Sequence, residues 1–542
     1  MFKKIVLFLL IIFTCIIDCK ANNILTTTNE NNSKIKIILG IPCTAKKLSY
    51  DAEQFELNDE SILEEDEKTI ENIIDTETLN NNKPSKVETN EINISKNKNK
   101  FYYESPIEEI NKIEALPKDS RTKEDEEINK INKAKYFAVK EIYKKIVRNL
   151  ELLNMFDIEY DERFCIDLSR FIYNGINTEM MEFIMSDKFI GNDLVLNSEI
   201  EIIDSNKLKL TIYLWDVIEG RFVEGKFYTF SYNENDYAIV GNRIADIIFK
   251  VATGEPKGLF DSKILYVSES GNVLHKEKQI NVMQFDGSHN SKLSINKTLK
   301  INPIFSKSNF NEIFYVEKVK DKKHADNFFV IKDNLTKNKV QIIKTKNSTM
   351  TSAPNFSPVK NQLVVASTDK NGYTNLVLFD FNKKTNKQLT NSEAICTAPS
   401  FNPDGNKIVY TSDKDGIRKL YILDLVTNQE KILTANTGVY DNPSWSPNGK
   451  YISFVKITNN KFKVGITDEE GLNEVYLKEA FLIEGVKWSP NSRFLIYTKQ
   501  TSAYGKGSIP KIYILDIVTG NEIQLPTPEN MGASDPDWIM NE

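Results

Sequence analysis

Residues that build metal, redox and nucleophilic sites are scarce in this chain of 542 residues. It has three histidines, at His275, His289 and His324, and five cysteines, none of them spaced as Cys-x-x-Cys. This pattern argues against a zinc site and against a disulfide scaffold. The chain has no Gly-x-Ser-x-Gly nucleophile elbow, and no Gly-rich phosphate loop follows an expected strand. The sequence therefore predicts no enzyme activity, no catalytic residues, no metal and no cofactor.

The chain also lacks an excess of positive charge. Its 70 Lys and Arg residues face 76 Asp and Glu residues, which gives a net charge of −6. Proteins that bind nucleic acids usually carry a basic surface that neutralises phosphates, so this balance argues against nucleic acid as a partner. With 40% apolar and 27% charged residues, the composition is typical of a globular protein. At about 150 residues per domain, the length allows two to four domains.

Only one long apolar run occurs, at the N-terminus. Residues 5–17 contain a single polar residue, Thr14, and the run is shorter than the ~20 residues that a membrane-spanning helix needs. A charged start, a short apolar core and Cys19-Lys20-Ala21 predict a secretory signal peptide over residues 1–21. An uncleaved anchor is the alternative. After cleavage three cysteines remain, and the sequence fits both a Cys43–Cys165 pair and free, buried thiols.

Residues 51–130 are predicted to form a disordered insert. Within them, residues 51–100 contain 14 Asp or Glu and 6 Lys residues, a net charge of −8. Such a stretch buries too little apolar surface to offset the entropy of the chain, and order is expected to resume near Lys133. Two explanations stay open. The insert is either an acidic tether for a partner or a tolerated surface insertion, since long loops cost little additional entropy.

Residues 34–50 and 131–258 are predicted to form a small α/β domain around this insert. Residues 134–156 have apolar side chains at helical spacing, and a second helix ends at Gly254, which suits a left-handed C-terminal cap. The expected strands are 33–43, 199–204, 207–217 and 221–231, and the expected helices are 134–156 and 234–252. Two helices on a mixed sheet are the simplest arrangement of these elements.

Residues 259–542 contain one repeated phrase, in which a Pro usually precedes an aromatic residue by two positions. The aromatic residues are Phe305, Phe356, Phe401, Trp445, Trp488 and Trp538. They follow one another at steps of 51, 45, 44, 43 and 50 residues, with four short strand-like segments per step. This period is typical of a β-propeller, in which each repeat forms one blade and its aromatic residue packs between blades.

The ring is predicted to close with six blades. Residues 535–538 read as a first strand without its own blade, whereas 263–267, 279–285 and 292–295 supply second, third and fourth strands without a first. Joining the two ends completes the sixth blade. The predicted fold class is therefore α+β, with a small N-terminal mixed α/β domain followed by a six-bladed β-propeller.

Six short stretches occur in a characteristic order. They are LWDV at 214–217, VEGKFY at 223–228, NRIADIIF at 242–249, TGE at 253–255, GLFD at 258–261 and KILYV at 263–267. Together with the repeats, this order closely resembles the TolB family of the bacterial Tol–Pal system, over about residues 34–45 and 134–540. The insert departs from the family pattern, and Asn242 stands where a His is usual.

The resemblance implies a non-catalytic periplasmic adaptor. TolB-like proteins bind the lipoprotein Pal through the propeller and TolA through the first residues of the mature chain. Their system supports the integrity of the outer membrane and its constriction during cell division. Here the mature N-terminus is expected to be the flexible segment 22–33, with Asn22, Asn23, Ile24 and Leu25 as TolA contacts. The resemblance implies a monomer that reaches the outer membrane only through Pal.

The Pal site is expected at the end of the propeller channel where the loops lead into the inner strands, which is the end that TolB-like proteins use. The expected Pal-binding residues are Asn302, Met350, Thr351, Ser352, Ala353, Thr397, Ala398, Asp441, Asn442, Glu484 and Asp535. Such a ring of short polar groups suits a partner loop that enters the channel. The alternative function is a periplasmic propeller that binds or hydrolyses a glycan or a peptide.

Overall fold

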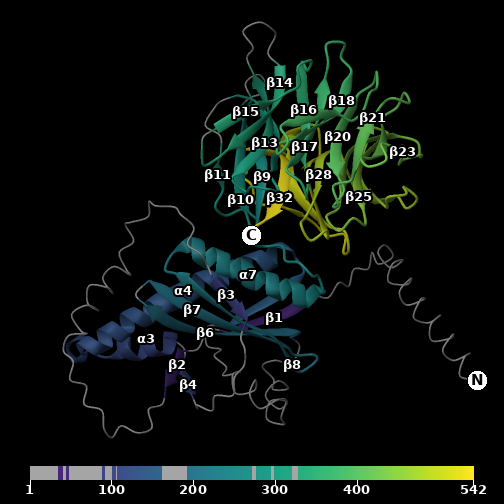
Figure 1. Cartoon of the computed structure of the whole chain (residues 1–542). Coiled ribbons are helices and arrows are strands. Elements are labelled where there is room, and N and C mark those ends of the chain that lie inside the picture. Colours follow the sequence, from purple (N-terminus) through teal and green to yellow (C-terminus); the bar gives the residue numbers. More distant parts are fainter. Residues whose placement is uncertain are drawn as a thin grey trace, which may run out of the picture. The chain divides into compact units, whose positions relative to one another are not determined.

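The computed structural model describes residues 34–40, 44–47, 88–91, 101–104, 106–161, 192–204, 206–271, 276–293, 298–319, 327–337 and 339–541. These residues form two compact units, which divide between Phe260 and Asp261 (Figure 1). The predicted signal peptide, the expected TolA contacts, residues 51–87, Cys43 and Cys165 lie outside the described residues.

The first unit contains a six-stranded mixed sheet with the order β3-β8-β7-β6-β1-β5. β1 (Ile35–Gly40) runs parallel to β5 (Phe156–Asp161) and β6 (Leu194–Asp204), while β6, β7 (Lys207–Asp216) and β8 (Arg221–Ser231) are antiparallel neighbours. In β7 the alternate residues Leu208, Leu210, Ile212 and Leu214 are fully buried. The period of two in the sequence therefore places one face of the strand in the core, as expected.

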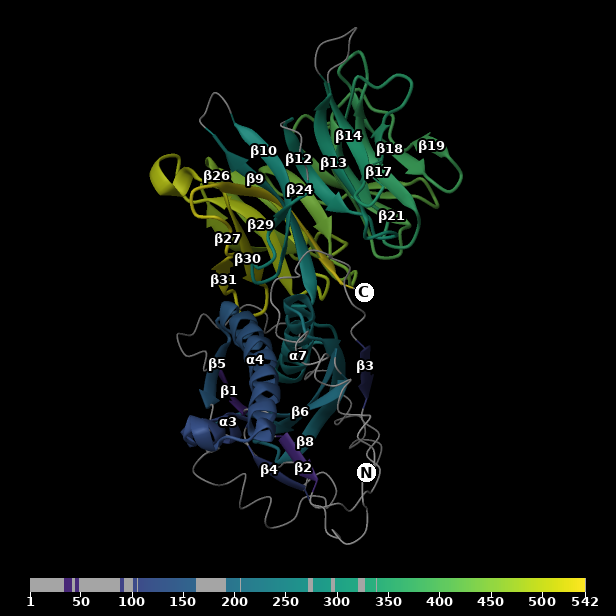
Figure 2. The same cartoon turned by 90° about the vertical axis from the view of Figure 1, so that its left-hand side faces the viewer.

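Two long helices of this unit, α4 (Lys123–Leu152) and α7 (Glu234–Thr253), pack against each other (Figure 2). The hydroxyl of Thr122 and the carboxylate of Asp125 form a capping box that starts α4. α7 ends at Gly254, whose φ of 72° is the predicted left-handed cap. Gly241 lies where the helices meet, because a Cβ atom there would be only 2.8 Å from the Lys145 Cβ. Beside it, the Asn149 amide donates a 2.8 Å hydrogen bond to Asn242.

The predicted disorder up to residue 130 is wrong for its C-terminal part. α3 (Pro106–Ala115), a short 3₁₀ turn (Lys118–Ser120) and the first turns of α4 occupy that stretch. Ile110 and Ile113 are buried, and Glu114 forms a 2.7 Å ion pair with Lys133 of α4. The sequence interpretation missed this helix because it was based on the charge and composition of the preceding residues rather than on the helical spacing of the apolar residues. Two short pairings also fall in or beside the insert: β3 (Glu88–Glu91) with β8, and β2 (Thr44–Lys47) with β4 (Phe101–Glu104).

The second unit contains six four-stranded sheets, each one blade of a propeller. Five blades are continuous in sequence: β12 (Lys300–Phe305), β13 (Glu312–Val319), β14 (Asn327–Asn334), β15 (Lys339–Ile343); β16 (Met350–Phe356), β17 (Gln362–Thr368), β18 (Thr374–Asp380), β19 (Thr385–Gln388); β20 (Cys396–Phe401), β21 (Lys407–Ser412), β22 (Lys419–Asp424), β23 (Glu430–Ile432); β24 (Val439–Trp445), β25 (Ile452–Thr458), β26 (Lys461–Thr467), β27 (Val475–Ala480); and β28 (Leu482–Trp488), β29 (Phe494–Gln500), β30 (Lys511–Asp516), β31 (Glu522–Gln524). A short 3₁₀ turn, Gly505–Ser508, precedes β30.

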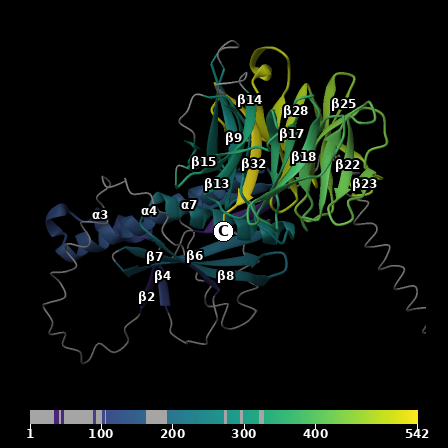
Figure 3. The ribbon, with the colours of Figure 1, turned by 45° about the horizontal axis from the view of Figure 1, so that its top comes forward.

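The sixth blade joins the two ends of the propeller, as predicted. Its strands are β9 (Ser262–Ser270), β10 (Glu277–Gln284), β11 (Ser291–Lys292) and the C-terminal β32 (Gly532–Met540). β32 pairs antiparallel with β9, and Figure 3 shows the yellow strand beside the teal one. The Trp538 indole is 2% exposed, stacks on Phe285 at 5.6 Å and donates a 2.8 Å hydrogen bond to Ser262. We refer to this sheet as the closing blade.

The repeated aromatic residues join neighbouring blades, which confirms the prediction from the repeats. Phe356 packs on Phe314 of the preceding blade at 5.5 Å, and the Trp488 indole donates to the carbonyl of Ser444, also in the preceding blade. Buried apolar clusters of the propeller likewise combine residues of neighbouring blades.

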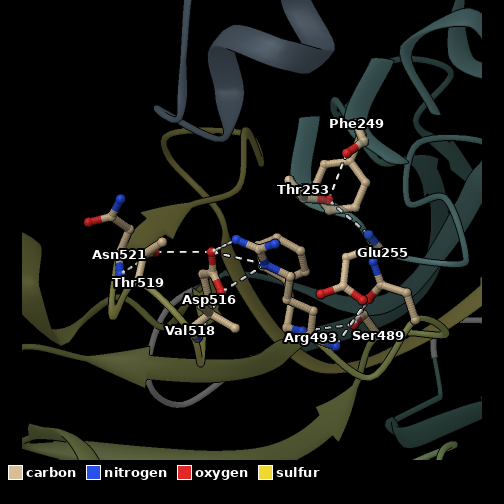
Figure 4. Close-up of polar contacts among 11 residues, drawn as sticks. Phe249, Thr253, Glu255, Ser489, Arg493, Asp516, Val518, Thr519 and Asn521 are labelled. Atoms are coloured by element: carbon tan, nitrogen blue, oxygen red, sulfur yellow. Dashed lines mark hydrogen bonds and ion pairs between the residues drawn. The ribbon is translucent and has the colours of Figure 1, made fainter. Parts of the chain in front are cut away.

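One blade contains a buried ion pair. The Arg493 guanidinium donates to both carboxylate oxygens of Asp516 at 2.9–3.2 Å, and Thr519 donates to the same carboxylate (Figure 4). Both charged side chains are less than a tenth exposed. The pair links the residue before β29 to the last residue of β30. Removing one partner would leave the other charge buried and unpaired, which is strongly destabilising.

Candidate partner-binding site in the propeller channel

Each inner strand of the propeller is interrupted by a β-bulge at the same place in the repeat. The pairing register shifts between Ser352 and Asn355 in β16, for example, and at the equivalent positions of the other five inner strands. One residue of every bulge is left-handed, with φ between 46° and 63°. These residues, here named the channel ring, are Asn302, Ala353, Ala398, Asn442, Gly485 and Asp535.

The left-handed conformation is costly for the five ring members other than Gly485, at roughly 1–2 kcal/mol each. Pro follows each of those five residues, and a following Pro disfavours the right-handed helical region. A bulge re-aims the strand and leaves one residue outside the ladder. The repeated Pro therefore helps to hold the same bulge in five blades, and the bulges turn the channel ring toward a common space.

That space is a cavity of about 70 Å³ lined from all six inner strands. The residues that line it are Asn302, Pro303, Ile304, Ala353, Pro354, Ala398, Pro399, Asn442, Pro443, Gly485, Val486, Lys487, Asp535 and Pro536. Since six blades contribute to one cavity, it lies on the axis of the propeller. Its walls combine proline rings with short polar side chains and two charges.

The expected Pal-binding residues lie within the inner strands rather than in the loops that lead into them. That part of the sequence interpretation is wrong, because the bulges extend each strand across the repeated Pro. Asn302, Ala353, Ala398, Asn442 and Asp535 line the cavity. Met350, Ser352, Thr397, Asp441 and Glu484 precede ring residues on the same strands.

Thr351 differs from its neighbours. It is fully buried, its hydroxyl donates to the carbonyl of Ile343, and it accepts a hydrogen bond from the backbone N–H of Val330. Its side chain therefore holds β16 to the preceding blade, and we leave it out of the contact set.

Acidic groups gather near the ring. Burial raises the pKa of Asp535, and the backbone N–H of Asn302 partly offsets this by donating to its carboxylate at 3.3 Å. Burial also raises the pKa of Glu484, with the carboxylates of Asp535 and Asp441 adding to the effect. Basic partners hold two neighbouring acids, because Lys278 pairs with Glu269 at 2.6 Å and Arg418 pairs with Asp441. Glu484 and Asp535 have no ion pair with any residue that the structure describes.

Hydrogen bonds between blades keep the ring in place. At three seams, the residue just before the repeated aromatic residue accepts a hydrogen bond through its side-chain oxygen from the backbone of the next blade. The backbone N–H groups of Phe305, Phe401 and Trp445 donate to Asp537, Asn355 and Ser400, respectively, at 2.8–3.0 Å. These bonds satisfy backbone groups that the bulges would otherwise leave without a partner. These bonds link neighbouring inner strands at three of the six seams around the channel.

Nine lining residues were not among the expected contacts: the five repeated prolines, Ile304, Gly485, Val486 and Lys487. A signal was present in the sequence, since Gly485-Val486-Lys487 aligns with the Asn442-Pro443-Ser444 of the preceding repeat. Reading the repeat for its exceptions would have singled out Lys487 as the one cation in that column.

Outside the channel, a second cavity of about 360 Å³ is lined by residues of α4, namely Lys140, Tyr143, Lys144, Val147, Arg148 and Glu151. The described residues contain no group of three or more His, Cys, Asp or Glu residues that could hold a metal ion. None of the described helices is both long and apolar enough to span a bilayer. Cys396 is buried beside Ser412, and His289 is the one described histidine.

Comparison with known proteins gives the family. Residues 249–541 match the family described as the TolB beta propeller domain. The Tol-Pal system protein TolB of Gluconobacter oxydans is 30% identical over 341 residues, which cover 62% of this chain and 72% of that protein. The TolB of Rickettsia akari is 33% identical over 251 residues, 46% of this chain and 52% of the relative. The chain thus spans about half the length of the Rickettsia relative in that match.

A solved structure gives the same fold. The crystal structure of TolB from Acinetobacter baumannii superposes with a TM-score of 0.62 at 19% identity, over 73% of this chain and 93% of that one. The match includes both the propeller and part of the preceding unit, since the propeller alone is shorter than the matched share. The family match over more than half of the chain and the Gluconobacter relative lead to one conclusion: this chain belongs to the TolB family.

Proposed function

We propose that the protein is a non-catalytic periplasmic adaptor of the Tol–Pal system. It binds the lipoprotein Pal at the propeller channel and TolA through the mature N-terminal segment 22–33. In this way it contributes to outer-membrane integrity and to constriction of the outer membrane during cell division. Membership of the TolB family, and the name of its relatives as Tol-Pal system proteins, support the assignment of this protein to that system.

One structural observation supports the channel as the Pal site. Five of the eleven expected contacts are members of the channel ring, four more directly precede a ring residue, and the ring, which surrounds a small cavity, has one member in every blade. Such a site can take the tip of a partner loop, because hydrogen-bonding groups set its register and the proline walls exclude water. A preformed surface also lowers the entropy cost of binding, because the channel residues need not become ordered when the partner binds.

A titration of purified partners tests this proposal. Soluble Pal and the periplasmic part of TolA are titrated separately into the mature chain and into a variant that lacks residues 22–33. We expect the full chain to bind both partners, and the shortened chain to bind Pal with unchanged affinity but no longer bind TolA. Absence of binding to Pal, together with turnover of a glycan or a peptide by the same preparation, would favour the alternative function.

A further inference from the structure

Lys487 occupies an exceptional position in the repeat. It stands directly before the aromatic residue of its inner strand, and the equivalent residues of the other blades are Ile304, Asn355, Ser400, Ser444 and Asp537. At three of these positions a side-chain oxygen accepts a hydrogen bond from the backbone of the next blade. A lysine ammonium has donors only and cannot serve in this way. Lys487 therefore has no part in the seam that its equivalents form.

The Lys487 side chain lines the cavity instead. It makes no hydrogen bond or ion pair with any residue in the described ranges, and it is only partly exposed. Burial lowers its pKa, while the carboxylates of Asp537 and Asp535 act in the opposite direction. Asp537 is already bound by the backbone N–H of Phe305 at 2.8 Å. A partly desolvated ammonium without a close counter-charge costs free energy, which a matching anion would recover.

Two further donors line the same cavity. Asn302 and Asn442 are members of the channel ring, and their side-chain amides are not engaged with any residue that the structure describes. The cavity of about 70 Å³ is large enough to admit a carboxylate group. The acids Asp535 and Asp537 lie close enough to influence Lys487, so a doubly charged phosphate is less well suited than a singly charged carboxylate.

We propose that Lys487 binds a carboxylate of the Pal segment that enters the channel, with the amides of Asn302 and Asn442 as additional donors. The inference rests on the proposed function and deepens it. It makes Lys487 a residue that determines specificity, because a partner without an acid at this point would leave the ammonium unpaired. The carboxylate can belong to an Asp or Glu side chain or to a chain terminus.

The test is a calorimetric titration of soluble Pal into the full mature chain and its variants. Lys487→Ser introduces the residue that Ser400 and Ser444 provide in other blades, so the fold should tolerate it. Lys487→Arg keeps the charge, and Lys450→Ser removes an exposed lysine from the neighbouring blade as a matched control. We expect Lys487→Ser to weaken Pal binding at least tenfold, and the other two variants to stay within threefold of the wild type. Thermal unfolding of each variant checks its fold, and Lys487→Gln replaces any serine variant that unfolds.

Pal variants identify the source of the carboxylate. Each Asp or Glu of Pal is changed singly to Asn or Gln, and a separate Pal carries an amidated C-terminus. The proposal expects one of these changes to weaken binding to the wild-type chain tenfold and to have no further effect on Lys487→Ser. If the wild type binds Pal and Lys487→Ser binds it equally well, the inference is wrong and the proposed function stands. If the wild type does not bind Pal, both are wrong.

Discussion

Ring closure depends on Trp538, so its replacement by Ala should destabilise the propeller as a whole. The indole is 2% exposed, stacks on Phe285 and donates a 2.8 Å hydrogen bond to Ser262. Truncating a buried aromatic residue of this size costs roughly 3–5 kcal/mol, because the transfer energy is lost and a cavity remains. The substitution would also remove the hydrogen bond from the indole to the buried Ser262 hydroxyl.

Urea unfolding followed by tryptophan fluorescence and circular dichroism measures this loss. Tyr504→Ala is the control, since Tyr504 is 88% exposed and its removal should change stability by less than about 0.5 kcal/mol. Deleting residues 535–542 removes most of the inner strand of the closing blade and should lower the midpoint further than Trp538→Ala does. Unchanged midpoints for both the substitution and the deletion would refute the closure of the ring by β32.

Three further outcomes follow from local contacts. Arg493→Met should lower the free energy of unfolding in urea by roughly 3–5 kcal/mol, because the Asp516 carboxylate stays buried without its partner. The double variant Arg493→Met, Asp516→Leu should lose less stability. An equal or larger loss would contradict a dominant role of the unpaired charge. Gly241→Ala should destabilise the first unit by roughly 1–3 kcal/mol despite the better helix propensity of Ala, since the new Cβ would lie 2.8 Å from the Lys145 Cβ. A stabilised variant would show that α4 and α7 can move apart at little cost. Glu484→Gln should raise the thermal midpoint near pH 7, because a raised pKa in the folded state makes the ionised carboxylate unfavourable there. That gain should fade as the pH falls through the raised pKa toward the ordinary value of 4.5, and a gain that does not depend on pH would need another cause.

The sequence predicted the propeller well because its evidence is repeated. Six copies of one phrase identify the blades, and the unmatched strand at each end predicts the closing blade. The cap at Gly254 was predictable for a local reason, since only a residue without a side chain enters the left-handed region at little cost. By contrast, the bulges could not be read from the repeats, because Asn302 or Ala353 before a Pro gives no sign of a left-handed backbone. The pairing of β3 with β8 depends on a partner distant in sequence, which composition does not reveal.

The most direct test of the account is Pal binding by a Thr397→Arg variant. Thr397 is partly exposed on β20, next to the ring residue Ala398, so a long cationic side chain there should obstruct the cavity. Thr427→Arg, in an exposed turn of the same blade, is the matched control. Calorimetric titration should show Pal binding weakened at least roughly tenfold, about 1.4 kcal/mol, by Thr397→Arg alone, with the unfolding temperature of both variants unchanged. Equal Pal affinity for the wild type, Thr397→Arg and a matching Met350→Arg would contradict the account and place the partner on another face of the propeller.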